Sequence, residues 1–424
     1  MKIAIIGDMH LGAFQADERR EDSFIQGKEA VETAIRENAD LIVLAGDVFD
    51  VRVPTQDVLA KAMAIFRLAA EAPSKNAKIV ELKGKDEKEI SRTALSGVPI
   101  IAIHGNHDRR GKGLVNPVEL MEKAGLLVHL NIAAAVLEIN SEKATIHGMS
   151  YVPEKFAKEV LEKFNPKPIK DATNIFVFHQ SIGQFLFTDD EHPSLMLEDL
   201  PAGFDLVVDG HIHWSAEHNK NGLNFLLSGS TVSTQMRNIE SERKKVIHIF
   251  ENGKLRSIPL ATQRPLYYET IDLREIEPDN LRKKVVETLN HIPQTANRKP
   301  LVRIVLRGTI KKGFEAADLN LHKIEEEFRD KFILHIGREK LLSKDGGEAK
   351  DVLEQLLSKH VSVEERGIQI LQKNLQASGY DGLDSAEEFF NLLVEGGQDA
   401  AYKFIKGKFG GSGAQGLRGS EVGQ

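Results

Sequence analysis

The chain has 424 residues, of which 41% are hydrophobic and 28% are charged, and its formal net charge is −7. This length and composition predict a globular protein of two or three domains. The absence of cysteine excludes disulfides, thiolate metal sites and cysteine nucleophiles. Any metal must then be bound by His, Asp, Glu or Asn, which suits Mn, Fe, Zn or Mg. The negative net charge does not indicate nucleic-acid binding, although phosphate contacts depend on local patches rather than on total charge.

The apolar start of the chain is short. Residues 3–6 are apolar, but Asp8, His10 and the charged run at 17–22 follow at once, so we expect no secretory signal. No apolar stretch approaches the roughly 18 residues that a membrane span needs. We therefore expect a cytoplasmic protein that does not bind a membrane.

Short apolar runs that end in ligand-type residues organise the first half of the chain. They lie at 3–6, 41–45, 98–103, 175–178 and 206–208. Such runs are typical of strands buried on both faces. Helical patterns alternate with them at about 22–38, 55–71, 117–124 and 153–164, which predicts an α/β core. Ligands of such cores bind beyond the carboxyl ends of the strands, where all these polar clusters fall.

The clusters supply carboxylate, imidazole and amide groups. Their candidate ligands are Asp8, His10, Asp47, Asn106, His179, His211 and His213. Two divalent ions about 3.5–4 Å apart share a carboxylate, activate water and neutralise a phosphate in one step. One such cluster is common by chance, but five in a fixed order at strand ends predict a functional two-metal site.

The series Asp8-x-His10, Gly46-Asp47, 105–108, His179 and 210–213 resembles the calcineurin-type metallophosphoesterase superfamily. This resemblance implies a β-sandwich flanked by helices. Within the superfamily, the chain is similar to the Mre-eleven/SbcD-type DNA double-strand-break repair nucleases. The closer likeness rests on residues 8–12, on residues 46–50 and on the layout that follows the catalytic domain.

The resemblance assigns metal ligands by position. One ion would be bound by Asp8, His10, Asp47 and His213. The other would be bound by Asp47, Asn106, His179 and His211, with Asp47 as the bridge. Both ions would be Mn²⁺.

The resemblance also assigns residues that act on the substrate. His107 would not be a ligand; it would stand over the phosphate and stabilise or protonate the leaving oxygen, which imidazole suits near neutral pH. Asp108 would orient His107. Related nucleases often carry a histidine three residues after the bridging aspartate, where this sequence has Asp50. Arg109 and Arg110 directly follow the metal motif and are the candidate DNA contacts.

Two other histidines and one insertion receive structural interpretations. His147 is expected on a core strand, and His104 is expected to face solvent beside the third cluster. The charged residues at 74–97 form an insertion before the third strand. This insertion is either a surface hairpin or a DNA contact, and the sequence does not decide between them.

The C-terminal half predicts further domains. A metallophosphoesterase (nuclease) domain at 1–255 is followed by a small α+β cap at 256–342, which in the resembling family helps to grip DNA. Within the cap, 266–273 and 301–307 alternate like exposed strands, and helical patterns lie at about 279–290 and 316–331.

A linker at 343–347 separates the cap from short amphipathic helices at 348–406, and a Gly-rich tail at 407–424 is disordered or left over from cloning. Helices this short bury little surface alone. They either pack on the cap or bind a partner by helix-in-groove contact. By resemblance, that partner would be a Rad-fifty/SbcC-type ATPase.

Basic residues gather near the cap, at Arg237, 243–245, 282–284 and 311–312. Such rows neutralise phosphates without reading sequence. An equally good interpretation is a solvated face balanced by nearby acidic residues.

Three functions are compatible with these features. The first is a Mn-dependent DNA nuclease, acting as a 3′–5′ exonuclease on duplexes and an endonuclease on single strands, with the ATPase and in association with the nucleoid. The second is another phosphoesterase, acting on a nucleotide, a phosphoprotein or a pyrophosphate. The third is a non-catalytic DNA scaffold, against which the complete ligand set argues. Homodimerisation through the helices at 55–71 and 117–124 is implied by resemblance, although Ala60, Ala62, Ala64, Leu68 and Ala69 equally suit a core-facing stripe.

Overall fold

The computed structural model describes residues 1–14, 18–111, 113–185, 193–220, 222–293, 298–314, 318–342 and 372. Residues Met1–Asp345 form one compact unit. The predicted linker at 343–347, the helical segment at 348–406 and the tail at 407–424 lie outside the described residues, apart from residue 372.

The first sheet has the strand order β13-β12-β1-β2-β4-β5. Its strands are β1 (Lys2–Ile6), β2 (Leu41–Leu44), β4 (Ile100–Ala102), β5 (Val128–His129), β12 (Val246–Glu251) and β13 (Lys254–Pro259). Strands β1, β2, β4 and β5 pair in parallel, and the hairpin β12–β13 closes one edge antiparallel to β1. The predicted strands β1, β2 and β4 therefore end side by side at one edge of this sheet.

The second sheet has the order β10-β11-β9-β8-β7-β6-β3. Its strands are β3 (Lys78–Lys83), β6 (Ala133–Ile139), β7 (Glu142–Met149), β8 (Thr173–Phe178), β9 (Leu206–Asp209), β10 (Ala216–Lys220) and β11 (Leu223–Leu227). The central strands β7, β8 and β9 are parallel. The other two predicted strands, β8 and β9, thus belong to this sheet rather than to the first.

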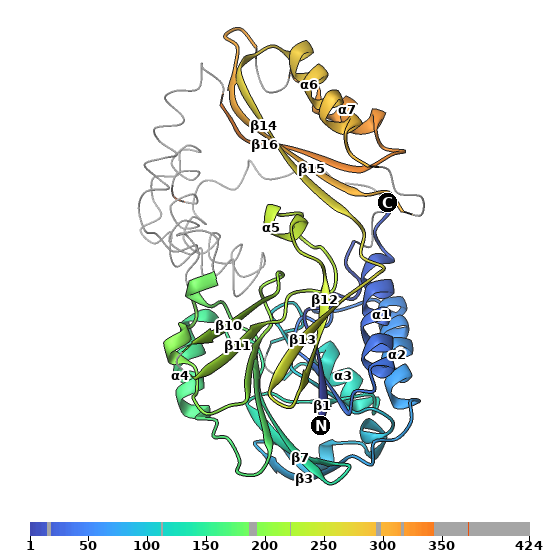
Figure 1. Cartoon of the computed structure of the whole chain (residues 1–424), viewed down its shortest axis with the longest axis vertical. Coiled ribbons are helices and arrows are strands. Elements are labelled where there is room, and N and C mark those ends of the chain that lie inside the picture. Colours follow the sequence, from blue (N-terminus) through green and yellow to red (C-terminus); the bar gives the residue numbers. More distant parts are fainter. Residues whose placement is uncertain are drawn as a thin grey trace, which may run out of the picture. The chain divides into compact units, whose positions relative to one another are not determined.

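Helices cover the outer faces of both sheets (Figure 1). They are α1 (Asp22–Arg36), α2 (Gln56–Ala70) and α3 (Pro117–Lys123) on the first sheet and α4 (Glu154–Phe164) on the second. A third apolar cluster, including Ile5, Val43 and Ile175, fills the space between the sheets. Because apolar side chains alternate between two buried faces, each central strand is buried on both sides. This confirms the predicted helix-flanked β-sandwich.

A separate three-stranded sheet follows, in the order β14-β15-β16. Its elements are β14 (Leu266–Ile276), α6 (Pro278–Asn290), β15 (Leu301–Ile310), α7 (Leu321–Glu327) and β16 (Ile333–Leu342). Both strand pairs are parallel. The prediction of an exposed strand at 301–307 is wrong in one respect: β15 is the central strand, and Ile304 and Leu306 pack against α6 and α7.

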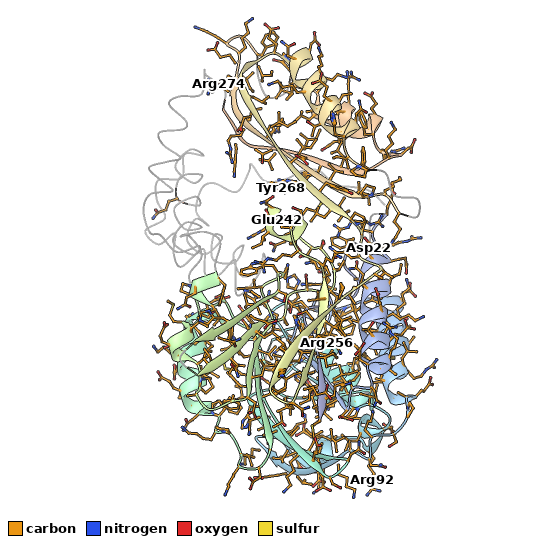
Figure 2. All side chains as sticks on the ribbon, viewed as in Figure 1. Asp22, Arg92, Glu242, Arg256, Tyr268 and Arg274 are labelled. Carbon is orange, nitrogen blue, oxygen red and sulfur yellow. The ribbon has the colours of Figure 1, made fainter. Side chains whose placement is uncertain are left out.

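The first helix is tied to the chain that leads into this sheet. The Asp22 carboxylate, labelled in Figure 2, accepts hydrogen bonds from Arg264 Nε and Nη2 at 2.8 Å each. Arg298 Nη2 also donates to Asp22, at 2.5 Å. Asp22 is 1% exposed, so this ion pair is buried.

The charged insertion is not a hairpin of its own. Within it, β3 pairs antiparallel with β6 at the edge of the second sheet. Two 3₁₀ turns, η1 (Glu87–Glu89) and η2 (Arg92–Leu95), follow. Whether this segment contacts DNA stays a prediction.

His147 lies on β7 and is buried, as predicted. The prediction for His104 is wrong: it is 6% exposed, and its Nδ1 lies 3.0 Å from His129 Nε2. The chain after β4 turns inward, with the His104 main-chain nitrogen donating to Ser150 Oγ at 3.0 Å. In the described part of the chain, no helix has the length and apolar character needed to cross a bilayer.

Candidate metal centre

The predicted ligands meet where strands of both sheets end. Asp8 and His10 follow β1, Asp47 follows β2 and Asn106 follows β4, all from the first sheet. His179 follows β8, and His211 and His213 follow β9, from the second sheet. The sandwich therefore brings together side chains that lie up to about 200 residues apart.

One group contains Asp8, His10, Asp47 and His213, whose candidate ligand atoms all lie within 4.8 Å of one another. The Nε2 atoms of His10 and His213 are 3.2 Å apart, and His213 Nε2 lies 3.7 Å from Asp8 Oδ2. The other ring nitrogen of His213, Nδ1, contacts the Thr234 hydroxyl. A partner of this kind fixes the ring orientation of a metal-binding histidine.

The second group gathers around Asn106. Its Oδ1 lies 3.1 Å from His179 Nε2 and 3.1 Å from His211 Nδ1. His179 Nε2 is also 3.4 Å from Asp47 Oδ2, so Asp47 faces both groups. His179 Nδ1 donates to the Ala45 carbonyl at 2.9 Å, which fixes the ring with Nε2 toward the centre, the position from which it would bind a cation.

The backbone at the strand ends is unusual. His10, Asp47 and His211 all have positive φ, at 45°, 40° and 64°. Such conformations cost about 1–3 kcal/mol each and concentrate at functional sites. Asp and His tolerate them better than most residues, but nothing in the sequence predicted them.

Glycines let the ligand loops approach closely. A Cβ on Gly105 would lie 2.0 Å from Asp47 Oδ1, and one on Gly210 would lie 2.1 Å from the Ala45 carbonyl oxygen. Gly46, at φ +97°, would place a Cβ 2.4 Å from His179 Nδ1. Only glycine fits these three positions without displacing a ligand.

The buried groups at this centre have shifted pKa values. Burial, together with the nearby Asp47 and Asp209, raises the pKa of Asp8 well above its usual range. Burial alone would lower the pKa of His179, but Asp47 and Asp8 raise it to about 10. Burial lowers the pKa of His211 to about 3. The buried negative charge of Asp47 and Asp8 that raises the pKa of His179 would equally favour a bound cation.

One observation makes metal the fitting partner. Asp8 Oδ2 is buried and has no hydrogen-bond partner among the described residues. A buried carboxylate oxygen left unpaired is costly, and a divalent cation with oxygen and imidazole ligands would satisfy it. The donor set, Asp, His and Asn without thiolate, matches the metals expected from the sequence.

His107 and Asp108 have separate environments. His107 Nδ1 donates to the main-chain carbonyl of Asp50 at 2.7 Å, and its side chain is 40% exposed. The Asp108 carboxylate accepts from the main-chain nitrogens of Val48, Phe49 and Gly105 at 2.8–3.0 Å. The expectation that Asp108 orients His107 is therefore corrected: the ring is held by Asp50, while Asp108 ties together the loops after β2 and β4.

Asp50 also contacts the metal centre. Its Oδ1 lies 3.1 Å from His10 Nδ1, so it orients His10 toward the first group. The only sequence signal for this role is the position of Asp50 three residues after Asp47.

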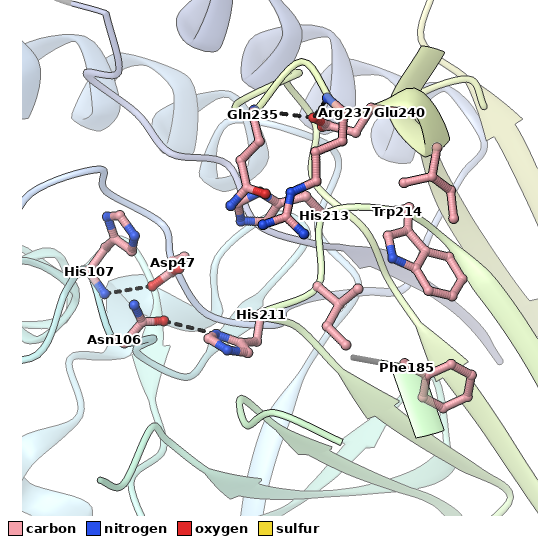
Figure 3. A pocket seen from close by; sticks show the side chains of 12 residues that line it. Asp47, Asn106, His107, Phe185, His211, His213, Trp214, Gln235, Arg237 and Glu240 are labelled. Atoms are coloured by element: carbon pink, nitrogen blue, oxygen red, sulfur yellow. Dashed lines mark hydrogen bonds between the residues drawn. The ribbon is translucent and has the colours of Figure 1, made fainter. Parts of the chain in front are cut away.

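A cavity of about 230 Å³ opens onto this centre (Figure 3). Asp47, His107 and His211 line it from the metal side, while Phe185 and Trp214 form an aromatic wall. Gln235, Arg237 and Glu240 also line it. Sequence reasoning missed the wall, because Phe185 and Trp214 meet only in the fold.

The predicted basic residues divide into different settings. Arg109 and Arg110 are half-buried, and neither belongs to the described lining of the cavity. Arg282 pairs with Glu327 and Lys311 with Glu277, which supports the interpretation of a balanced surface for these two.

The basic row at 243–245 lies nearer the cavity. The Arg243 guanidinium stands 4.9 Å from the centre of the Trp214 ring, and Lys245 is buried.

Comparison with known proteins gives one family and several named relatives. The family described as calcineurin-like phosphoesterase matches residues 1–215. The double-strand break repair protein MRE11 of Encephalitozoon cuniculi is 28% identical over 320 residues, 70% of this chain and 54% of that protein. The DNA double-strand break repair protein Mre11 of Methanopyrus kandleri is 30% identical over 234 residues, 52% of this chain and 46% of that protein.

The corresponding protein of Saccharolobus solfataricus is 26% identical over 318 residues, 73% of this chain and 75% of that protein. This chain therefore spans about half the length of the first two relatives and three quarters of the third.

Proposed function

Because the chain belongs to the calcineurin-like phosphoesterase family, we propose that it is a metal-dependent phosphodiesterase that cleaves DNA. The convergence of seven ligand-type side chains from two sheets on one buried centre carries this proposal. The relatives named for double-strand break repair support DNA as the substrate.

Two Mn²⁺ ions are proposed for the centre. Asp8, His10, Asp47 and His213 would hold one ion, and Asp47, Asn106, His179 and His211 the other. The pairing of Asp47 Oδ2 with His179 and its 3.9 Å approach to His10 Nε2 support Asp47 as the bridge. When bound, two such ions activate a water molecule and neutralise the phosphate.

His107 is proposed as the general acid. Its Nδ1 proton is committed to the Asp50 carbonyl, so in the imidazolium form Nε2–H is the proton available to the leaving oxygen. The ring lines the cavity beside Asp47, and its main-chain nitrogen donates to Asp47 Oδ1 at 2.9 Å. His107 is therefore fixed to the metal centre without being part of it.

We place the DNA strand along the cavity, with Arg237 on its lining. Arg109 and Arg110 would contact the DNA backbone farther out, since they follow the 105–108 motif directly in the chain. Such contacts neutralise phosphates and add affinity that falls with salt. Double-strand 3′–5′ exonuclease and single-strand endonuclease activities, and work at the nucleoid, belong to this proposal.

Two partners are proposed, a second copy of this chain and a Rad-fifty/SbcC-type ATPase. Support for the dimer comes from apolar side chains left exposed on α2, on α3 and just before them: Val53, Ala60, Ala64, Leu114 and Leu120. Ala62 and Ala69 of the same helix are in the core instead. The alanines of α2 therefore include both core residues and exposed residues that support a dimer surface. The ATPase would bind the segment at 348–406.

The test is cleavage of end-labelled duplex and single-stranded DNA with Mn²⁺, Mg²⁺ or chelator. Wild type, His107→Ser and the exposed-site control His322→Ser are compared. We expect Mn²⁺-dependent cleavage that is lost in His107→Ser and kept in the control. If wild type spares DNA but hydrolyses an aryl phosphodiester with Mn²⁺, the DNA assignment falls. The alternative, action on a nucleotide, phosphoprotein or pyrophosphate, then takes its place.

A further inference from the structure

One residue of the basic row at 243–245 is inside the protein. Lys245 has 4% of its side chain exposed, and its Nζ lies 2.7 Å from Glu240 Oε1, whose side chain is 2% exposed. Lys244, the next residue back, is exposed. DNA binding does not explain why the ion pair between Lys245 and Glu240 is buried.

The Lys245 ammonium uses its three donors on three acceptors. Besides Glu240 Oε1, it donates to the His213 carbonyl at 2.9 Å and to Ser230 Oγ at 2.9 Å. The Ser230 main-chain nitrogen also donates to the His213 carbonyl, at 3.2 Å. The main chain of one candidate metal ligand is thus held directly by a buried charge.

The carboxylate of Glu240 binds the main chain of a loop that lines the cavity. Glu240 Oε2 accepts from the main-chain nitrogen of Gln235 at 3.1 Å and from that of Arg237 at 3.5 Å. Both residues line the cavity (Figure 3). Just before them, Thr234 contacts His213 Nδ1. One ion pair therefore contacts both the ligand His213 and the loop that faces the substrate.

We propose that Lys245 and Glu240 are positioning residues that set the metal-binding geometry of His213 and the placement of the 234–237 loop together. Loss of either partner leaves the other charge buried and unpaired, which forces local rearrangement. Because the same pair anchors both elements, metal affinity and substrate affinity are expected to change together. This inference rests on the proposed function, because it requires that the centre binds metal and that the cavity binds DNA.

The test compares Lys245→Met with Lys244→Met, the exposed neighbour. Mn²⁺ binding is measured by titration calorimetry. Partners of this kind change metal affinity by about 10–100-fold, so we expect at least about a tenfold weaker affinity for one of the two ions in Lys245→Met. Lys244→Met should bind both ions like wild type.

A double variant, Lys245→Met with Glu240→Leu, separates positioning from folding. Replacing both charges by apolar groups of similar size is often neutral for stability, so urea unfolding should stay close to wild type. Mn²⁺ affinity should remain reduced and the KM for DNA raised, because neither the His213 carbonyl nor the 234–237 loop regains its anchor. Wild-type Mn²⁺ affinity in a folded double variant would overturn the inference. Failure of wild type itself to bind Mn²⁺ would instead overturn the proposed function.

Discussion

The Asp47 Oδ1 atom accepts a hydrogen bond from the main-chain nitrogen of His107 at 2.9 Å. Its other oxygen, Oδ2, lies 3.4 Å from His179 Nε2. One carboxylate therefore positions the proposed acid with one oxygen and faces the candidate metal ligands with the other. Charge and geometry at this residue can be separated by mutation.

Asp47→Asn keeps an oxygen that can accept from the His107 nitrogen but removes the negative charge. We expect Mn²⁺ affinity to fall by more than about 100-fold, since loss of a ligand charge exceeds the 10–100-fold effect of outer partners. Calorimetric titration measures this, with Asp57→Asn on the exposed start of α2 as the control. Two Mn²⁺ ions bound at wild-type affinity by Asp47→Asn would contradict the bridging role.

Asp50 offers a finer test, because it orients His10 through a hydrogen bond at 3.1 Å. Asp50→Asn retains an acceptor for His10 Nδ1, whereas Asp50→Ala removes it. Both variants keep the main-chain carbonyl that holds His107. We expect about a tenfold loss of Mn²⁺ affinity in the alanine variant and a smaller loss in the asparagine variant. Equal affinity in the two variants would show that the contact with His10 does not matter.

Gly46 tests the close packing of the ligand loops. In Gly46→Ala the new Cβ would meet His179 Nδ1 at 2.4 Å, so His179 must move and Mn²⁺ binding should be lost. Gly222→Ala is the matched control, since φ there is also positive, at +80°, and no atom of the described residues lies within 4 Å of the Cβ position. The control should lose only about 1–2 kcal/mol of stability from the backbone strain and keep its metal affinity. Similar defects in both variants would mean that strain, not the clash, is responsible.

The buried pair between Asp22 and Arg264 is expected to contribute strongly to stability. Asp22→Asn leaves Arg264 buried without its charge partner, so the free energy of unfolding should fall by about 3–5 kcal/mol. Urea unfolding with chelator present measures this. The ion pair between Glu37 and Arg256, labelled in Figure 2, has Arg256 55% exposed, and Glu37→Gln should leave the unfolding midpoint unchanged. An equal effect of the two substitutions would show that burial does not decide the outcome.

His147 predicts a pH dependence of stability. Burial, with a smaller effect from Lys83, lowers its pKa to about 4, whereas in the unfolded chain it lies near 6.5. Below pH 6.5 the unfolded chain binds more protons than the native one, so stability is greatest above pH 6.5 and falls toward pH 4. Each such histidine contributes up to about 1.4 kcal/mol per pH unit in this window.

The measurement is urea unfolding with chelator at pH 7 and pH 5. In His147→Leu the difference between the two pH values should shrink by about 1–2 kcal/mol. The exposed-site variant His322→Leu should keep the wild-type difference. If the difference in unfolding free energy between pH 7 and pH 5 is the same in both variants, His147 does not have a lowered pKa in the folded protein.

Local signals carried much of the fold and the site. Apolar runs followed by Asp, His or Asn predicted β1, β2, β4, β8 and β9 and the residues after them. They did so because burial on two faces and turn formation both leave a pattern in a short stretch of sequence. The division of these strands between two sheets was not predictable residue by residue, since it depends on pairing between distant segments.

The same limit explains the missed and corrected residues. His104 looks like a loop residue, but it is buried because His129, 25 residues later, packs on it. Lys245 resembles part of a surface row and is buried because Glu240 and the His213 carbonyl surround it. Charge and polarity are visible in a sequence, but the acceptors that make burial tolerable come from the fold.

Each proposed ion would draw ligands from both sheets, and this has a consequence for the newly made chain. His211 and His213 are synthesised long after Asp8 and Asp47, and they reach the centre only when β9 has packed against the first sheet. Neither half of the sandwich holds a complete ligand set. The proposed phosphodiesterase activity would therefore be absent throughout synthesis and early folding, and metal uptake would join the two halves when the ligand set is first complete.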